Sequence, residues 1–167
     1  MGSMRIFKKS MIMATRNKKR FLAAVFLYCA LSWWVSFSID QGDLILTSMG
    51  VVGGLIIATV YGYILTQFRK LQIATLKCIG WDNKSIQILM VGEIVFVSLL
   101  GYLVTLELDI HILGIASYLP FTGFQEFVFS GFSLLLALII VIIAQIPAII
   151  LAYRRTLTVR PIVALKA

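Results

Sequence analysis

Apolar and polar residues follow one another in long blocks along this chain. Four apolar runs, at about residues 21–39, 44–68, 86–108 and 127–153, are separated by shorter polar stretches. As a helix, each run is long enough to cross a bilayer core of about 30 Å. A chain of 167 residues, 60% of them apolar, has no room to bury four such runs in a water-soluble core. The pattern predicts an all-α membrane protein with four transmembrane helices.

The start of the chain has two readings. A basic leader before an apolar run is also typical of a secretory signal, but this run exceeds the usual length of about 7–15 residues and no small-residue cleavage site follows. We therefore expect a retained first span. Residues 1–3, ahead of Met4, resemble a tag remnant and are set aside from the fold. Residues 4–20 then form a basic N-terminal segment.

The basic residues occur only in alternate polar segments of the chain, which lie on the same side of the membrane if each run crosses it. They precede the first run, separate the second from the third, or follow the fourth: Arg5, Lys8, Lys9, Arg16, Lys18, Lys19, Arg20; Arg69, Lys70, Lys77, Lys84; Arg154, Arg155, Arg160, Lys166. The positive-inside rule then places both termini in the cytoplasm, with residues 154–167 as a cytoplasmic tail. The net charge of +8 thus reflects orientation and attraction to lipid headgroups, and no nucleic-acid partner is expected.

Small residues recur every fourth position in the second run, at Gly50, Gly54, Ala58 and Gly62. This spacing places them on one helix face, where they permit the close backbone approach that drives helix association in lipid. The sequence leaves open whether the face packs within one chain or between two copies.

Of the polar side chains inside the runs, two stand out. Gln145, beside Pro147, is able to bond to a neighbouring helix. Glu93 lies about two turns inside the third run, and an intramembrane carboxylate is a functional candidate. The alternative for Glu93 is that it lies shallow enough to reach cytoplasmic water or a basic group.

The segment between the second and third runs, residues 69–85, reads as a short cytoplasmic helix and a sharp turn. Its apolar residues spread around much of the helix, a pattern that suits a helix wedged between the membrane domain and another protein. Gly80 is the expected helix stop, because glycine readily takes a positive φ. Asp82 or Ser85 is the expected cap of the next helix.

Several kinds of chemistry lack their motifs in this sequence. There is no Gly-rich phosphate loop followed by Lys-Ser/Thr, no HExxH and no Ser-His-Asp set. Cys29 and Cys78 lie far apart and have no zinc-ligand spacing, and His111 stands alone in a surface loop. We expect no enzyme activity, no metal and no cofactor on this chain.

Two stretches resemble the FtsX/MacB-like family of ABC transporter permeases. The first, residues 69–93, has a basic residue, a hydrophobic-Lys-x-hydrophobic-Gly core, an Ile-Leu pair and a Glu: Arg69, Ile73, Leu76, Lys77, Ile79, Gly80, Ile88, Leu89, Glu93. Cys78 and Gln72 stand where the family usually has Ala and Glu. The second stretch has the family's ending: Pro147, Arg154, Arg155, Pro161, Ala164, Leu165, Lys166.

The resemblance, which covers roughly residues 46–167, implies a multi-pass permease subunit of the plasma (cytoplasmic or inner) membrane. Its implied partners are a dimer of separate ABC ATPase subunits, which would bind ATP and Mg, and a second permease copy or a paralogue. Residues 69–85 would be the coupling helix seated on the ATPase, with Arg69, Lys70, Ile73, Leu76, Lys77, Ile79 and Gly80 as its coupling residues.

This chain departs from the family between its first two runs. The family usually carries a large extracytoplasmic domain there, whereas this chain has only "SIDQGDL". It is either a natural minimal permease or a chain from which the domain has been removed. Two other classes stay open: a non-transporting membrane scaffold or signalling adaptor, and a secondary transporter or channel that uses Glu93.

Overall fold

The structure is a computed structural model that describes residues 3–118 and 128–158. Within these ranges the chain is helical and contains no strand. The helices are α1 (Ser3–Thr15), α2 (Lys18–Asp40), α3 (Leu44–Phe68), α4 (Lys70–Cys78), α5 (Asn83–Tyr118) and α6 (Gly131–Thr158).

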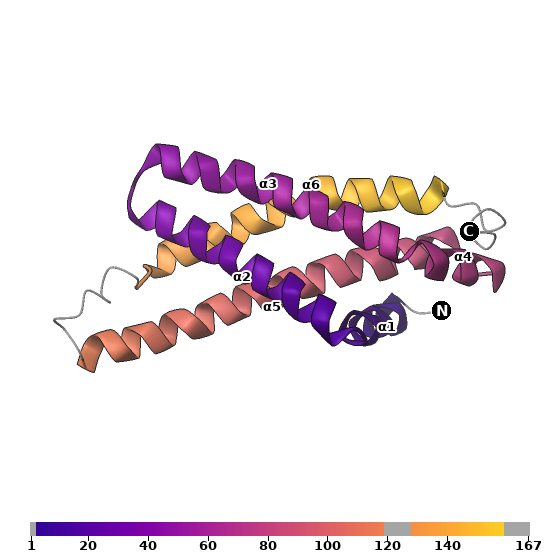
Figure 1. The fold of residues 1–167 in the computed structure, drawn as a ribbon, viewed down its shortest axis with the longest axis horizontal. Helices are drawn as coiled ribbons and strands as arrows, with labels where there is room; N and C mark the ends of the chain where they lie inside the picture. Colours follow the sequence, from indigo (N-terminus) through magenta and orange to yellow (C-terminus); the bar gives the residue numbers. More distant parts are fainter. Residues whose placement is uncertain (1–2, 119–127, 159–167) are drawn as a thin grey trace.

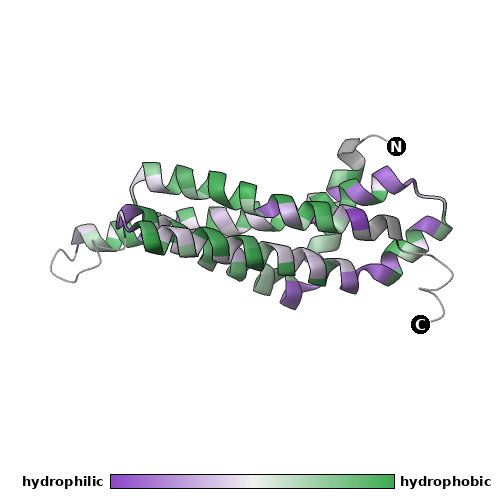
Figure 2. Cartoon of the chain, turned by 90° about the horizontal axis from the view of Figure 1, so that it is seen from above, coloured by the Kyte–Doolittle hydropathy of each residue, from purple (hydrophilic) through white to green (hydrophobic). Residues whose placement is uncertain are grey.

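Among the described residues, four helices are long and apolar enough to cross a membrane: α2, α3, α5 and α6. The predicted all-helical, four-span class is confirmed at this level, and α3 has the bounds that the apolar pattern predicts. Large apolar side chains on these helices face outward, among them Leu44, Ile56 and Val60 of α3. Hydrophobic residues cover the middle of the bundle, and hydrophilic residues gather toward its ends (Figure 2). This surface suits contact with lipid rather than water.

The four long helices form one bundle in which α2 contacts α3, α5 and α6 (Figure 1). Helix α3 also packs on α6, and α5 on α6 and α1. Helices α1 and α4 and the last turns of α6 lie at one end, and the α2–α3 turn lies at the other (Figure 1). The described basic residues therefore collect at a single end of the bundle.

Glycines allow the closest helix contacts. A Cβ added at Gly101 of α5 would lie 2.6 Å from the Tyr28 Cβ of α2. A Cβ at Gly92 of α5 would lie 2.7 Å from the Ser10 Oγ of α1. Since real Cβ atoms do not approach other atoms so closely, α5 holds both α2 and α1 at distances that only glycine permits.

The short α2–α3 connection is set by two residues. Gly42 has a φ of +66°, which reverses the chain at little steric cost. The carboxylate of Asp43 then accepts hydrogen bonds from the backbone N–H groups of Ile45 (2.8 Å) and Leu46 (3.4 Å). Asp43 is thus the N-cap of α3.

The sequence reading missed α1. Residues 4–20 were predicted only as a basic segment, yet Ser3–Thr15 forms a helix that buries Ile6, Ser10 and Ala14 against its neighbours. These residues are spaced four apart, so they share one face. The lysines between them mask the periodicity in so short a segment.

Helix α5 extends beyond the predicted end of its span near residue 108, up to Tyr118. The surface loop expected after residue 108 therefore begins later. From the sequence, Pro120 and Gly123 are the expected turn formers of this loop, and both lie outside the described residues. Asp109, which suggested a loop, is buried within the helix and accepts a hydrogen bond from the Phe129 N–H at 2.9 Å. Because this carboxylate is satisfied by the chain entering α6, it does not interrupt the helix.

The start of α6 also differs from the prediction. The helix begins at Gly131, and the predicted first residue, Phe127, lies outside the described residues. Asp40, at the end of α2, accepts a hydrogen bond from the Ser130 N–H at 2.9 Å. Together with Asp109, it fixes the start of α6 at the end of the bundle opposite α4.

Candidate functional site

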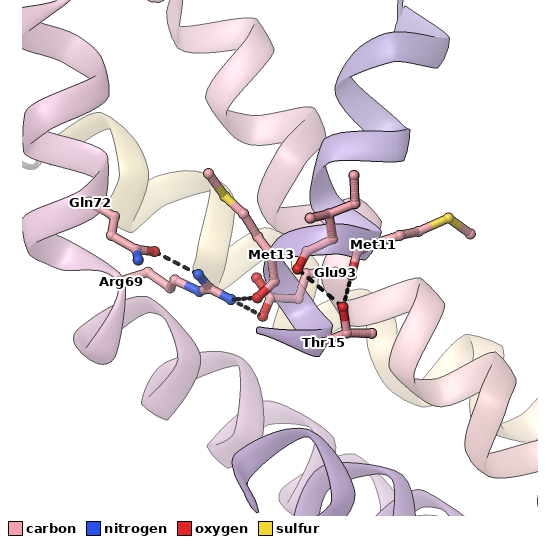
Figure 3. A network of polar contacts seen from close by, with 7 residues as sticks. Met11, Met13, Thr15, Arg69, Gln72 and Glu93 are labelled. Atoms are coloured by element: carbon pink, nitrogen blue, oxygen red, sulfur yellow. Dashed lines mark hydrogen bonds and ion pairs between the residues drawn. The ribbon is translucent and has the colours of Figure 1, made fainter. Parts of the chain in front are cut away.

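A single residue, Arg69, separates α3 from α4, and its side chain points inward (Figure 3). Its Nη2 donates to the Glu93 Oε1 of α5 at 2.5 Å and to the Met13 carbonyl oxygen of α1 at 3.0 Å. Its Nη1 donates to the Gln72 Oε1 of α4 at 2.6 Å. One guanidinium thus joins α1, α4 and α5 where the second span ends. We call Arg69, Glu93, Gln72 and Met13 the Arg69 network.

The Arg69 network is largely shielded from solvent. The Glu93 side chain is 4% exposed and the Arg69 side chain 13%. The second carboxylate oxygen of Glu93, Oε2, is buried and has no hydrogen-bond partner among the described residues. Burial of either charge alone would be very costly, so each depends on the other for its place in the bundle. From the sequence, Glu93 was either a functional carboxylate or one that reaches cytoplasmic water or a basic group. In the structure it pairs with a basic group, the guanidinium of Arg69.

Gln72 occupies the position where the resemblance implies an acid. Its amide oxygen accepts a bond from Arg69 as a carboxylate would, but without a charge. Glu93 is therefore the carboxylate that balances Arg69 within this network. A planar guanidinium has five donors in a fixed fork, which lets it serve three acceptors at once.

Helix α4 has two different faces. Ile73 and Ala74 are buried, and Ile73 belongs to a core with Ile6, Leu89 and other residues of α1 and α5. The opposite face comprises Leu71, Thr75, Cys78 and Ile79, all of them exposed. Leu71 is 59% exposed and Ile79 is 70% exposed. We call these four residues the outer face of α4.

A glycine ends α4 and turns the chain toward α5. Gly80 has a φ of +87°, which confirms the predicted helix stop. Its N–H donates to the Lys77 carbonyl oxygen at 3.1 Å, and the Trp81 N–H to the Leu76 carbonyl oxygen at 3.0 Å. This pair of bonds is a Schellman motif. Leu76 and Trp81 both pack on the core beneath α4, so the turn is anchored, and α5 begins just after Asp82.

The structure distributes the predicted coupling residues over different environments. Arg69 points into the network, Ile73 is buried, and Leu76 and Lys77 are half-buried. Lys70, Ile79 and Gly80 are exposed. The sequence reading missed Leu71, Thr75 and Cys78 as members of the same exposed face. Their spacing of three to four residues was the available signal, but apolar residues all around the helix obscured it.

The four small residues of α3 form a packed face within the chain. Gly50, Gly54, Ala58 and Gly62 are all buried. A Cβ added at Gly54 would lie 2.9 Å from the Leu31 Cδ2 of α2, and one at Gly62 would lie 2.9 Å from the Ala148 Cβ of α6. This face of α3 thus packs against α2 and α6. It is therefore already covered within a single chain.

Gln145 is 3% exposed and lies in α6, on the same side as the buried Ala144 and Ala148. Pro147 is inside this helix, as the sequence indicates. The described structure does not bring Gln145 into the Arg69 network, so the two intramembrane polar residues of the sequence reading do not form one site.

Comparison with protein-family models finds no match, and comparisons with curated proteins and with solved structures find no significant match either.

Proposed function

We propose that this chain is the permease subunit of an ABC transporter of the FtsX/MacB-like type. In this proposal α4 is the coupling helix, and it receives a separate ATPase at the cytoplasmic end of the bundle. The supporting observation is the division of α4 into a face buried on α1 and α5 and an apolar outer face. This support is added to the sequence resemblance.

The outer face of α4 suits a protein partner. It lies at the basic end of the bundle, beyond the apolar middle, so lipid tails would not cover Leu71 and Ile79 there. Exposed apolar side chains rimmed by charged residues are typical of protein contacts. Lys70 supplies a charge beside this face. The area is small, which is consistent with one element of a larger interface.

The Arg69 network gives α4 a route for transmitting force. A displacement of α4 would act directly on Arg69 and, through its bonds, on α5 and α1. Close-packed helices transmit strain because protein interiors compress little. ATP and Mg would bind to the partner ATPase, and ATP-driven closure of an ATPase pair would require a second permease copy or a paralogue. We place this assembly in the plasma (cytoplasmic or inner) membrane, with both termini of the chain in the cytoplasm.

The proposal is tested by co-expressing the tagged chain with the ABC ATPases of its source organism. We expect one ATPase to co-purify in a fixed ratio and to gain ATP turnover in the complex. Leu71→Asp places a charge on the outer face without touching the core, and it should weaken ATPase binding by roughly tenfold or more.

Asn17→Asp is the matched control. It adds the same charge at the same end of the bundle, on an exposed residue that stays a favoured N-cap of α2. Recovery of the ATPase should be unchanged for this variant. Equal recovery with Leu71→Asp, or no ABC ATPase bound to the wild-type chain, would refute the coupling role.

A further inference from the structure

A large open groove lies between α2 and α3 on the basic side of the bundle. Its volume is about 890 Å³, within the range of pockets that hold small molecules. The first three turns of α2 form one side, the last two turns of α3 the other, and Glu93 and Val97 of α5 the floor. Helices α2 and α3 meet at their turn and diverge toward this end (Figure 1).

The rim of the groove is strongly basic. Five basic side chains line it, against one acid, Glu93, whose charge is balanced by Arg69. The other four are Arg16, Lys18, Lys19 and Arg20, all exposed. The rim therefore carries an excess of positive charge, which favours the binding of an anion.

The backbone of α2 adds to this preference. The first turn of α2 lines the groove, and the Asn17 side chain makes no capping bond to it. Free N–H groups at a helix start, together with the helix dipole, favour a negative group such as phosphate. Arg20 also lies over the Phe68 ring, with its Cζ 4.1 Å from the ring centroid, and so reaches across the mouth of the groove.

The wall below the rim is apolar. It is made by Ala23, Ala24 and Leu27 of α2 and by Tyr61, Ile64 and Leu65 of α3. All of these residues lie within helices long and apolar enough to span the membrane. The groove thus joins a cationic rim to an apolar channel at the depth where a lipid has its phosphate and the start of its acyl chains.

We propose that this groove binds an anionic phospholipid, with the phosphate at the rim formed by Lys18, Lys19 and Arg20 and one acyl chain between α2 and α3. A soluble phosphate would satisfy the rim but leave the apolar wall uncovered. A neutral lipid tail would cover the wall but leave the basic rim without a counter-charge. An anionic lipid satisfies both parts, and each Lys or Arg near a membrane surface contributes to the attraction.

Native mass spectrometry of the full chain, delipidated in neutral detergent, measures the binding of added phosphatidylglycerol and phosphatidylcholine. We expect phosphatidylglycerol to bind more tightly. Lys18→Gln/Lys19→Gln should weaken it by about tenfold. Lys8→Gln/Lys9→Gln removes the same charge from α1, outside the groove, and should leave binding nearly unchanged. Equal weakening by both pairs would overturn the proposal, because the attraction would then be that of the whole basic surface.

A second pair of variants tests the acyl chain. Ala23→Phe fills the groove wall, whereas Ala30→Phe adds the same ring to an exposed position of α2 outside it. Only Ala23→Phe should abolish phosphatidylglycerol binding. Glycerol phosphate, which has the headgroup charge without the chain, should bind far more weakly than the lipid. If it binds as tightly as the lipid and Ala23→Phe has no effect, the groove is a site for soluble anions and the lipid proposal fails.

Discussion

Arg69 and Glu93 are 24 residues apart in the sequence, and their contact shows how one ion pair joins separate parts of a helical bundle. Helices α1, α4 and α5 also share an apolar core, so the pair is not needed merely to hold them together. The ion pair instead determines where α4 lies, because a buried guanidinium with three acceptors fixes α4 relative to α1 and α5. The break between α3 and α4 therefore lies at a defined point of the bundle.

Removal of one partner of this pair should cost more than removal of both. Glu93→Leu leaves a buried cation and Arg69→Met a buried anion, and we expect each to lower the free energy of unfolding by about 3–5 kcal/mol. The double variant should lose less than either single variant, since both charges are then gone. Unfolding in mixed micelles, followed by circular dichroism, gives the three values. Additive losses would show that the two side chains do not depend on each other.

Sequence reasoning identified both residues but not their contact. Glu93 attracted attention as a carboxylate in an apolar run, and Arg69 as a basic residue at a span end. Periodicity indicates which residues share one face of a helix. A contact between two helices depends also on how those helices cross. The bond from Arg69 to the Met13 carbonyl was beyond prediction for a further reason: α1 itself was not expected as a helix.

At the scale of the helices, α3 shows how small residues determine a packing partner. Its buried face contacts α2 in the half near Asp43 and α6 in the half near Arg69. The every-fourth-residue spacing of Gly50, Gly54, Ala58 and Gly62 was sufficient to predict the face. It was insufficient to predict the neighbour, because a flat small-residue face accepts any helix that approaches closely.

Gly62 provides a test of this packing. In Gly62→Ala the new Cβ would lie 2.9 Å from the Ala148 Cβ and 3.1 Å from the Ala148 backbone, so α3 and α6 must move apart. We expect a loss of about 1–3 kcal/mol in the free energy of unfolding. Gly53→Ala is the control on the same helix, where a Cβ meets nothing within 4 Å. This change should be neutral or slightly stabilising, because alanine is the better helix former. Equal losses for both variants would contradict the described α3–α6 contact.

The four long helices were predictable because each is a run of apolar residues with polar ends, a signal that needs no knowledge of neighbours. Helix α1 and the extension of α5 were not. Ser3–Thr15 mixes lysines with apolar residues, and Asp109 and His111 interrupt an apolar stretch. In both places the helix is sustained by tertiary contacts: the core around Ile6 for α1 and the Phe129 N–H for Asp109.

At the scale of the whole molecule, the two ends of the bundle differ in character. At one end, Asp43 caps α3 after the short α2–α3 turn, and Asp40 and Asp109 accept hydrogen bonds from the residues just before α6. The other end carries α1, α4, the Arg69 network and the basic rim of the α2–α3 groove. Features able to meet a partner or a lipid headgroup therefore gather at one end, the end that the positive-inside rule predicts to be cytoplasmic.

The proposed function depends most on α4 being covered by the ATPase, and the chain contains its own probe for that contact. Cys78 lies exposed on the outer face of α4, whereas Cys29 is buried in the bundle. The direct measurement is the rate at which a maleimide modifies Cys78 in the free chain and in the complex with its ATPase. Cys78→Ser/Gln41→Cys moves the exposed thiol to the α2–α3 turn and serves as the control.

We predict that the ATPase reduces modification of Cys78 to a small fraction of the free rate and leaves the thiol at position 41 unaffected. Modification of Cys78 at the same rate in a complex that demonstrably contains the ATPase would contradict the assignment of α4 as the coupling helix.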